Sequence, residues 1–253
     1  MDDRSYFAIR PAIIVAIVVA FLTAAVLVLV PGWNSDEAPN PRAPLGTYDG
    51  CVVVDVSSST RKSRHAYLRA AREFALRVGT SSDGEICVIT AGGNPLASEV
   101  LGADVGPDRG VADNNAQEKA QVSQKVDHFV DQLGRLLEAE RTERPGSAVI
   151  ASMIAASRAL REGGRLLVAT DGLETSSLGQ FTQMNLSPPG RRRFIVRLQR
   201  RDLLARLGGV TVEMPFLNFS SATVAIERQV AIEAFWLEYL QRAGATVEIG
   251  RRG

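Results

Sequence analysis

The sequence predicts an α/β domain built on a doubly wound, mostly parallel sheet and preceded by one transmembrane helix. Short continuous apolar runs recur along the chain, and segments with the 3.6-residue period of helices lie between them. Such runs are typical of strands that helices cover on both faces, as in parallel sheets. An apolar stretch of helical length near the start of the chain predicts the membrane helix.

The membrane segment is predicted from residues 11–33, which contain no charged side chain. Its apolar run Ala12–Val30 comes close to the about 20 residues with which an α-helix crosses roughly 30 Å of hydrocarbon. Tyr6 and Phe7 precede the run and Trp33 follows it, where interfacial aromatic residues belong. A cleaved signal peptide would have a shorter apolar region and a small-residue cleavage site, so we expect an uncleaved anchor.

The flanking charges predict the topology of the chain. Arg4 and Arg10 precede the anchor and only Arg42 follows closely, which favours a cytoplasmic N-terminus. We therefore expect a single-pass protein of the cell membrane with its folded domain outside the cytoplasm. The expected parts are a tail (1–10), the transmembrane anchor (11–33), a Pro-rich linker (34–47) and the folded domain (48–253).

Strands and helices are expected to alternate through the folded domain. A Gly-rich segment, residues 91–110, breaks the pattern and predicts a hairpin at the sheet edge with a surface loop. Gly244 is placed as a helix stop. The expected strands are 51–56, 85–90, 165–170, 210–217 and 246–249, and the expected helices are 61–78, 116–140, 147–161 and 225–245, the second with an apolar stripe of Val122, Val126, Phe129, Leu133 and Leu136.

The charge balance argues against a nucleic-acid binder. The chain has 29 basic and 28 acidic residues, and the basic residues are scattered. The densest basic run, Arg191 to Asp202, alternates with apolar residues and is expected to form the solvated face of an amphipathic helix.

Two aspartates follow apolar strands. Asp55 follows "CVVV" and precedes four consecutive hydroxyl residues, and Asp171 follows "RLLVAT". Because ligands bind beyond the carboxyl ends of parallel strands, we expect the two aspartates to be neighbours at such a site. A single aspartate often opens a turn after a strand, but two at matching strand ends favour a functional site.

The motifs around these aspartates resemble those of von Willebrand factor type A domains. "DVSSS" from Asp55 resembles the family motif D-x-S-x-S, and "TDG" from Thr170 resembles its second aspartate motif. The family has a threonine in a loop where this chain has Ser147 in "RPGSAVIAS", which keeps the hydroxyl but loses the methyl group that restricts its rotamer. The resemblance in element order extends from Tyr48 to the C-terminus.

This resemblance implies a metal-ion-dependent adhesion site that holds one divalent cation, Mg²⁺ or else Mn²⁺ or Ca²⁺. Oxygen ligands suit these ions, and a protein partner would offer an acidic side chain to the bound metal. The implied ligands are Asp55, Ser57, Ser59, Ser147 and Asp171.

Other roles for the same residues stay open. Ser57 or Ser59 could cap the helix that follows, and Ser147 could cap its own helix. Glu174 is expected to be a charge at the rim of the site and not a ligand.

The expected function is metal-dependent protein–protein interaction and not catalysis. The chain lacks the common hydrolase, nucleotide and dinucleotide motifs, and both histidines, His65 and His128, fall within expected helices as surface residues. One alternative is a metal-independent envelope scaffold with a decayed site. Another is a Mg²⁺-dependent phosphoryl-transfer enzyme with Asp55 as nucleophile, although such an enzyme would want an acid where Ser57 stands. Partner identity and oligomeric state stay open.

The two cysteines, Cys51 and Cys87, lie on strands expected to be neighbours. They could pair in an oxidising compartment, but a bridge between parallel strands is geometrically awkward, and buried cysteine is a good small hydrophobe. The sequence therefore favours free thiols.

Overall fold

The computed structural model describes residues 46–81, 84–92, 100–108, 115–139, 146–217 and 224–248. These residues lie within one compact unit of the chain, Pro39–Gly253. The expected tail and membrane anchor, and all of the expected linker except its last two residues, lie outside the described part. Within the described residues, no helix is long and apolar enough to cross a membrane.

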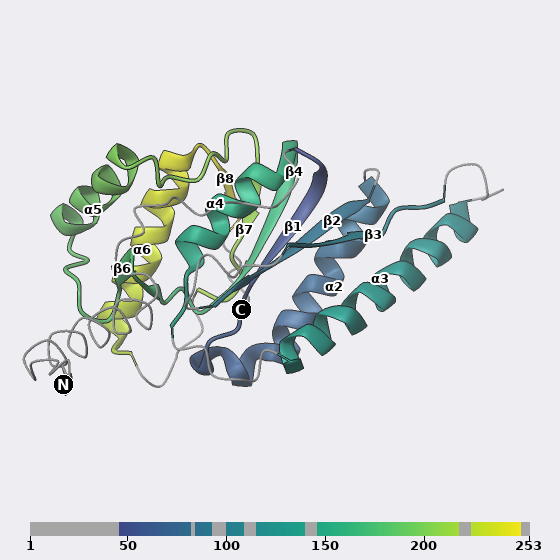
Figure 1. Cartoon of the computed structure of the whole chain (residues 1–253), viewed down its shortest axis with the longest axis horizontal. Coiled ribbons are helices and arrows are strands. Elements are labelled where there is room, and N and C mark those ends of the chain that lie inside the picture. Colours follow the sequence, from purple (N-terminus) through teal and green to yellow (C-terminus); the bar gives the residue numbers. More distant parts are fainter. Residues whose placement is uncertain are drawn as a thin grey trace, which may run out of the picture. The chain divides into compact units, whose positions relative to one another are not determined.

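The described residues form a six-stranded sheet with helices on both faces and a separate two-stranded hairpin (Figure 1). The strands are β1 (Tyr48–Asp55), β2 (Glu85–Ala91), β3 (Val100–Asp104), β4 (Leu160–Ala169), β5 (Thr175–Ser176), β6 (Gly179–Gln180), β7 (Thr211–Glu213) and β8 (Thr246–Glu248). The helices are the 3₁₀ helix η1 (Ser58–Ser63) and the α-helices α2 (Arg64–Ser81), α3 (Asn115–Ala139), α4 (Val149–Ala159), α5 (Pro188–Arg200) and α6 (Ile226–Ala243).

The six strands are ordered β3-β2-β1-β4-β7-β8. All neighbouring strands are parallel except β2 and β3, which are antiparallel. The prediction of a mostly parallel α/β sheet is confirmed, as is the hairpin at its edge. β1 and β4 pair at the centre of the sheet, with β2 and β7 on their outer sides.

Helices cover both faces of the sheet, which explains the continuous apolar runs of its strands. Figure 1 shows α2 and α3 on one face and α4, α5 and α6 on the other. Side chains alternate along β1, so Cys51 and Val53 pack under α4 while Val52 and Val54 pack under α2. All eight residues of β1 are buried.

Several boundaries differ from the prediction. β4 begins at Leu160 rather than Arg165, because Leu160 pairs with Tyr48 before an irregularity in the register. The first expected helix opens with the six-residue helix η1. On α3, Leu137 is buried where Leu136 was expected, since the 3.6-residue period favours the position four residues after Leu133. Gly244 ends α6 with a φ of 83°, as predicted.

The basic run forms the expected amphipathic helix, α5, with one exception. Arg191 is 9% exposed and donates hydrogen bonds to Glu238 of α6 at 2.7 and 3.1 Å. It also donates to the carbonyl of Leu186 at 2.9 Å. The first arginine of the run therefore joins α5 to α6 and does not belong to the solvated face.

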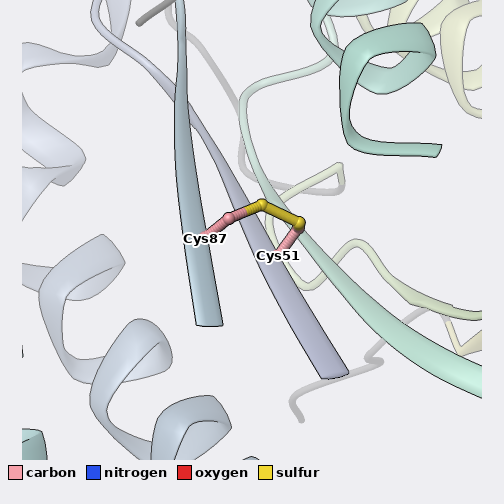
Figure 2. The surroundings of a disulfide bond; sticks show 2 residues. All are labelled: Cys51 and Cys87. Atoms are coloured by element: carbon pink, nitrogen blue, oxygen red, sulfur yellow. A yellow bond between two sulfur atoms is a disulfide. The ribbon is translucent and has the colours of Figure 1, made fainter. Parts of the chain in front are cut away.

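The expectation of free thiols is wrong: Cys51 and Cys87 form a disulfide (Figure 2). The two residues are direct partners in the register of β1 and β2, and both side chains lie on the same face of the sheet. Their Cα atoms are 4.4 Å apart, which lies at the short end of the usual range for disulfides. Because the two cysteines are direct partners in the register, a bridge between these parallel strands can form, contrary to the expectation from the sequence.

Candidate metal site

The site lies where β1 and β4 end. These strands are parallel, and Val54 of β1 pairs with Ala169 of β4. Asp55 is the last residue of β1, while Thr170 and Asp171 come directly after β4. The two aspartates thus lie at neighbouring strand ends, as the sequence predicts.

Asp55 is fully buried, and both of its carboxylate oxygens accept hydrogen bonds. Oδ1 accepts the backbone N–H of Ser57 at 2.9 Å. Oδ2 accepts the hydroxyls of Ser147 and Thr170, each at 2.8 Å. One carboxylate thereby joins three segments of the chain that are up to 115 residues apart.

Burial and, second, the nearby charge of Asp171 raise the pKa of Asp55 from 3.8 to about 6, against the lowering effect of its hydrogen bonds. The same two aspartates, together with burial, raise the pKa of Tyr67 on α2 above its ordinary value. The site therefore concentrates negative charge in a poorly solvated place. A cation bound there would relieve this repulsion.

The hydroxyl residues after Asp55 do not cap η1 through Ser57 or Ser59. Ser57 is the N-cap residue by backbone position, but its side chain makes no capping hydrogen bond. Its Oγ lies 3.1 Å from Oγ of Ser59, and Ser59 is exposed. The hydrogen bonds that stabilise this turn come from Thr60. Its buried hydroxyl lies 2.8 Å from the carbonyl oxygen of Asp55 and 2.9 Å from that of Ser57. The hydroxyls of Ser57 and Ser59 therefore contact each other and are not used as helix caps.

Ser147 also does not cap its own helix. The N-cap position of α4 is Ala148, which has no side-chain cap. The Ser147 hydroxyl donates to Asp55 instead, and Ser147 is 1% exposed. The structure thus places this serine in the site, at the position where the family motif has threonine.

Asp171 differs from Asp55 in having an oxygen without a partner. Its Oδ1 accepts the N–H of Leu173 at 3.0 Å. Its Oδ2 is buried and has no hydrogen-bond partner among the described residues. A buried carboxylate oxygen without a donor is costly, and a cation would satisfy it.

Gly172 allows the backbone to turn directly after Asp171. Its φ is +82°, and a Cβ at this position would lie 2.7 Å from Cδ2 of Leu217. The Gly172 carbonyl accepts the indole N–H of Trp236 at 2.9 Å, which fixes the turn against α6. The residue after the second aspartate is therefore glycine for steric reasons.

Glu174 is not a rim charge, so this expectation is wrong. It is fully buried, and burial raises its pKa to about 8. Oε2 accepts the N–H of Ile150 at 2.8 Å, and Oε1 accepts the hydroxyl of Ser176. Its position two residues after a glycine turn carries no sign of this burial, because one of its hydrogen-bond partners, Ile150, comes from the distant helix α4.

Sequence reasoning also missed Thr170 and Thr175. Thr170 donates to Asp55, and its Oγ1 accepts the N–H of Gly172 at 3.0 Å. A hydroxyl residue directly before the second aspartate was the available signal for Thr170. As expected, His65 and His128 are exposed residues of α2 and α3.

The residues at the two strand ends suit a hard divalent cation. The five predicted ligands offer only oxygen, from two carboxylates and three hydroxyls, and one carboxylate oxygen has no other partner. Among the described residues, no group of three or more His, Cys, Asp or Glu side chains could hold a metal. A cation at this place would therefore depend on the serine hydroxyls.

Comparison with known proteins gives similarity at the level of structure alone. No family model matches the chain, and no curated protein matches it. Similar solved structures include a von Willebrand factor type A protein from Catenulispora acidiphila (18% identity, TM-score 0.37) and the human COPII-coat protein Sec24c (12% identity, TM-score 0.36). The alignments cover 81% and 82% of this chain, which spans only 39% and 30% of those two proteins.

Proposed function

We propose that this chain is a von Willebrand factor type A-like domain that binds a protein partner through one divalent cation, Mg²⁺ or else Mn²⁺ or Ca²⁺. Asp55, Ser57, Ser59, Ser147 and Asp171 would hold the cation. The observation that carries the proposal is the buried, unpaired Oδ2 of Asp171 beside the Asp55 hydrogen-bond cluster.

The donor set supports recognition of an acidic partner. Two carboxylates and three neutral hydroxyls leave a divalent cation incompletely coordinated, so the bound ion would offer a position to a partner carboxylate. We therefore expect weak cation binding by the chain alone and tighter binding with the partner, through reciprocal linkage.

Binding is favoured over catalysis by the environment of Asp55. A phosphoryl-transfer nucleophile needs a carboxylate oxygen free to attack, but both Asp55 oxygens accept hydrogen bonds and the residue is fully buried. Both histidines are on exposed helical positions. The proposal therefore includes no enzymatic activity.

We also propose that the domain is held outside the cytoplasm by the N-terminal anchor. The Cys51–Cys87 disulfide supports this, since disulfides persist in oxidising compartments. β1 runs from Tyr48, near the linker, to Asp55 at the site, and eight extended residues span roughly 25 Å. The site would thus lie at the opposite end of β1 from the residue that follows the linker in the sequence. Protease added to intact cells or spheroplasts should digest the domain, and protection until lysis would reverse this topology.

The metal proposal is tested with the full chain in detergent. Mn²⁺ binding is measured by electron paramagnetic resonance, and proteins from the envelope are captured in Mg²⁺ and in EDTA. We expect one Mn²⁺ per chain, and a partner that is retained in Mg²⁺, released by EDTA and absent with Asp55→Ala. Capture that is unchanged in EDTA and with Asp55→Ala would favour the scaffold.

A further inference from the structure

Glu174 is a fully buried carboxyl group that the proposed metal site does not use as a ligand. It lies three residues after Asp171, and Ile150, whose N–H it accepts at 2.8 Å, lies three residues after Ser147. The side chain therefore bridges the two chain segments that carry these proposed ligands. Its other oxygen is occupied by the hydroxyl of Ser176.

The bond to Ile150 satisfies the start of α4. The first N–H groups of an α-helix have no partner within the helix, so a side-chain oxygen that accepts from one of them is favourable there. The N-cap residue Ala148 supplies no side-chain acceptor. Glu174 takes this role from a distant loop, and a backbone hydrogen bond from Val149 also acts on its carboxyl.

Thr175 joins the same two segments a second time. The N–H of Ser147 donates to Oγ1 of Thr175 at 2.7 Å, and the N–H of Thr175 donates to the carbonyl of Ser147 at 2.9 Å. These two hydrogen bonds and the bond from Ile150 to Glu174 therefore connect the Ser147 segment to the loop after Asp171 at three points. Neither segment can shift along the other without breaking them.

We propose that Glu174 is a positioning residue for the cation site: its carboxyl ties the first turn of α4 to the loop after Asp171 and so fixes the Ser147 hydroxyl relative to the Asp171 carboxylate. This inference rests on the proposed function, because it assigns Glu174 a purpose in cation binding. Burying a carboxyl group is costly, and a helix start can be capped more cheaply by a local serine or aspartate. A local cap would not connect the two segments that carry Ser147 and Asp171.

The first test compares Mn²⁺ affinity with stability in the full chain. Groups that hold metal ligands in place typically contribute about 10- to 100-fold to metal affinity, so Glu174→Ala should weaken Mn²⁺ binding by at least about tenfold. Thr175→Val, which removes one of the three contacts, should weaken it less. The control is Leu133→Ala on α3, a buried residue on the other face of the sheet, which should lower the melting temperature without changing Mn²⁺ affinity.

The results separate the two proposals. If the wild-type chain binds no Mn²⁺, the proposed function fails. If the wild-type chain binds Mn²⁺ and folded Glu174→Ala binds it equally tightly, the positioning role is overturned and the proposed function stands.

Amide hydrogen exchange in EDTA tests, in the absence of metal, whether Glu174 holds the first turn of α4 against the loop after Asp171. Removal of the Glu174 carboxyl should speed exchange at Ile150, and also at Ser147 and Thr175, whose amides it does not contact. Faster exchange at Ile150 alone would show a local helix cap and overturn the positioning role. Glu174→Gln keeps an acceptor oxygen and should restore slow exchange at Ser147, which keeps the test decisive if Glu174→Ala does not fold.

Discussion

β1 and β4 lie side by side and each leads to an aspartate, but their carboxyl ends are held in different ways. The end of β1 is fixed from several sides: Asp55 is fully buried with three hydrogen-bond donors, and four residues earlier Cys51 is bridged to β2. The end of β4 opens into a glycine turn, and Asp171 keeps a buried oxygen that has no partner in the described part of the chain. The segment beyond that turn is held by buried Glu174 and by Thr175.

Two similar sequence motifs can therefore have unequal roles. The β1 end is a hydrogen-bonded framework, whereas the β4 end carries the unsatisfied group that a ligand would complete. Changes at the first end should therefore affect stability more, and changes at the second should affect cation binding more.

Removal of the disulfide should be the largest change in stability. The cysteines are 36 residues apart, and closing a loop of that length in the unfolded chain corresponds to about 4 kcal/mol. The double variant Cys51→Ala/Cys87→Ala should lose up to that amount in denaturant unfolding and keep its Mn²⁺ affinity, because strand pairing on both sides still holds β1. Alkylation of wild-type chain in denaturant without reductant is the control: a mass gain would show free thiols and contradict the bridge.

Glu174→Gln should change how stability depends on pH. Burial raises the pKa of Glu174 from 4.5 to about 8, so the folded chain keeps a proton that the unfolded chain has released. The free energy of unfolding of the wild type therefore falls as pH rises from about 4.5 to 8, while glutamine cannot ionise. Relative to wild type, the variant should gain about 3 kcal/mol between pH 6 and pH 9 in EDTA.

Denaturant unfolding at the two pH values measures this difference. The matched control is Glu138→Gln, an exposed glutamate of α3, whose stability difference from wild type should stay constant. A constant difference for Glu174→Gln as well would mean that Glu174 is not held protonated in the folded chain.

Asp171→Asn should separate cation binding from stability. Loss of the carboxylate charge should weaken Mn²⁺ binding by about 100-fold or more, equivalent to about 2.7 kcal/mol. Asparagine can still accept the N–H of Leu173, so the free energy of unfolding should change by less than about 1 kcal/mol. Calorimetry and denaturant unfolding measure the two effects, with the exposed Asp131→Asn on α3 as control. A large stability loss with unchanged Mn²⁺ binding would reverse the roles of the two strand ends.

Ser147→Thr should have the smallest effect. Threonine keeps the hydroxyl that donates to Asp55, and its methyl group restricts the rotamer. Mn²⁺ affinity measured by calorimetry should be unchanged or modestly higher. Ser147→Ala serves as the contrast and should bind Mn²⁺ more weakly; weaker binding in the threonine variant too would show that the buried site cannot accept the methyl group.

Those residues of the candidate site that belong to a local sequence pattern could be predicted. Asp55 and Asp171 were recognisable because each follows an apolar strand, and parallel strands bring their carboxyl ends to one edge. Ser57, Ser59 and Ser147 were recognisable by motif. Glu174 was misplaced and Thr175 was missed, because their partners come from segments that no local pattern connects. Thr170 was missed although its place directly before the second aspartate is a local signal.

The sequence by itself determined the α/β alternation, the mostly parallel sheet, the edge hairpin and the place of the two aspartates. Apolar periodicity and strand-end polarity are properties of short segments, so they can be read without knowing the neighbours. Packing of the segments was needed to show that Cys51 and Cys87 share a register, that Glu174 is buried against α4, and that Asp171, unlike Asp55, keeps a buried oxygen with no partner among the described residues. Those outcomes depend on which distant groups remove water from a side chain and which donors reach it, and both are set when the segments pack together.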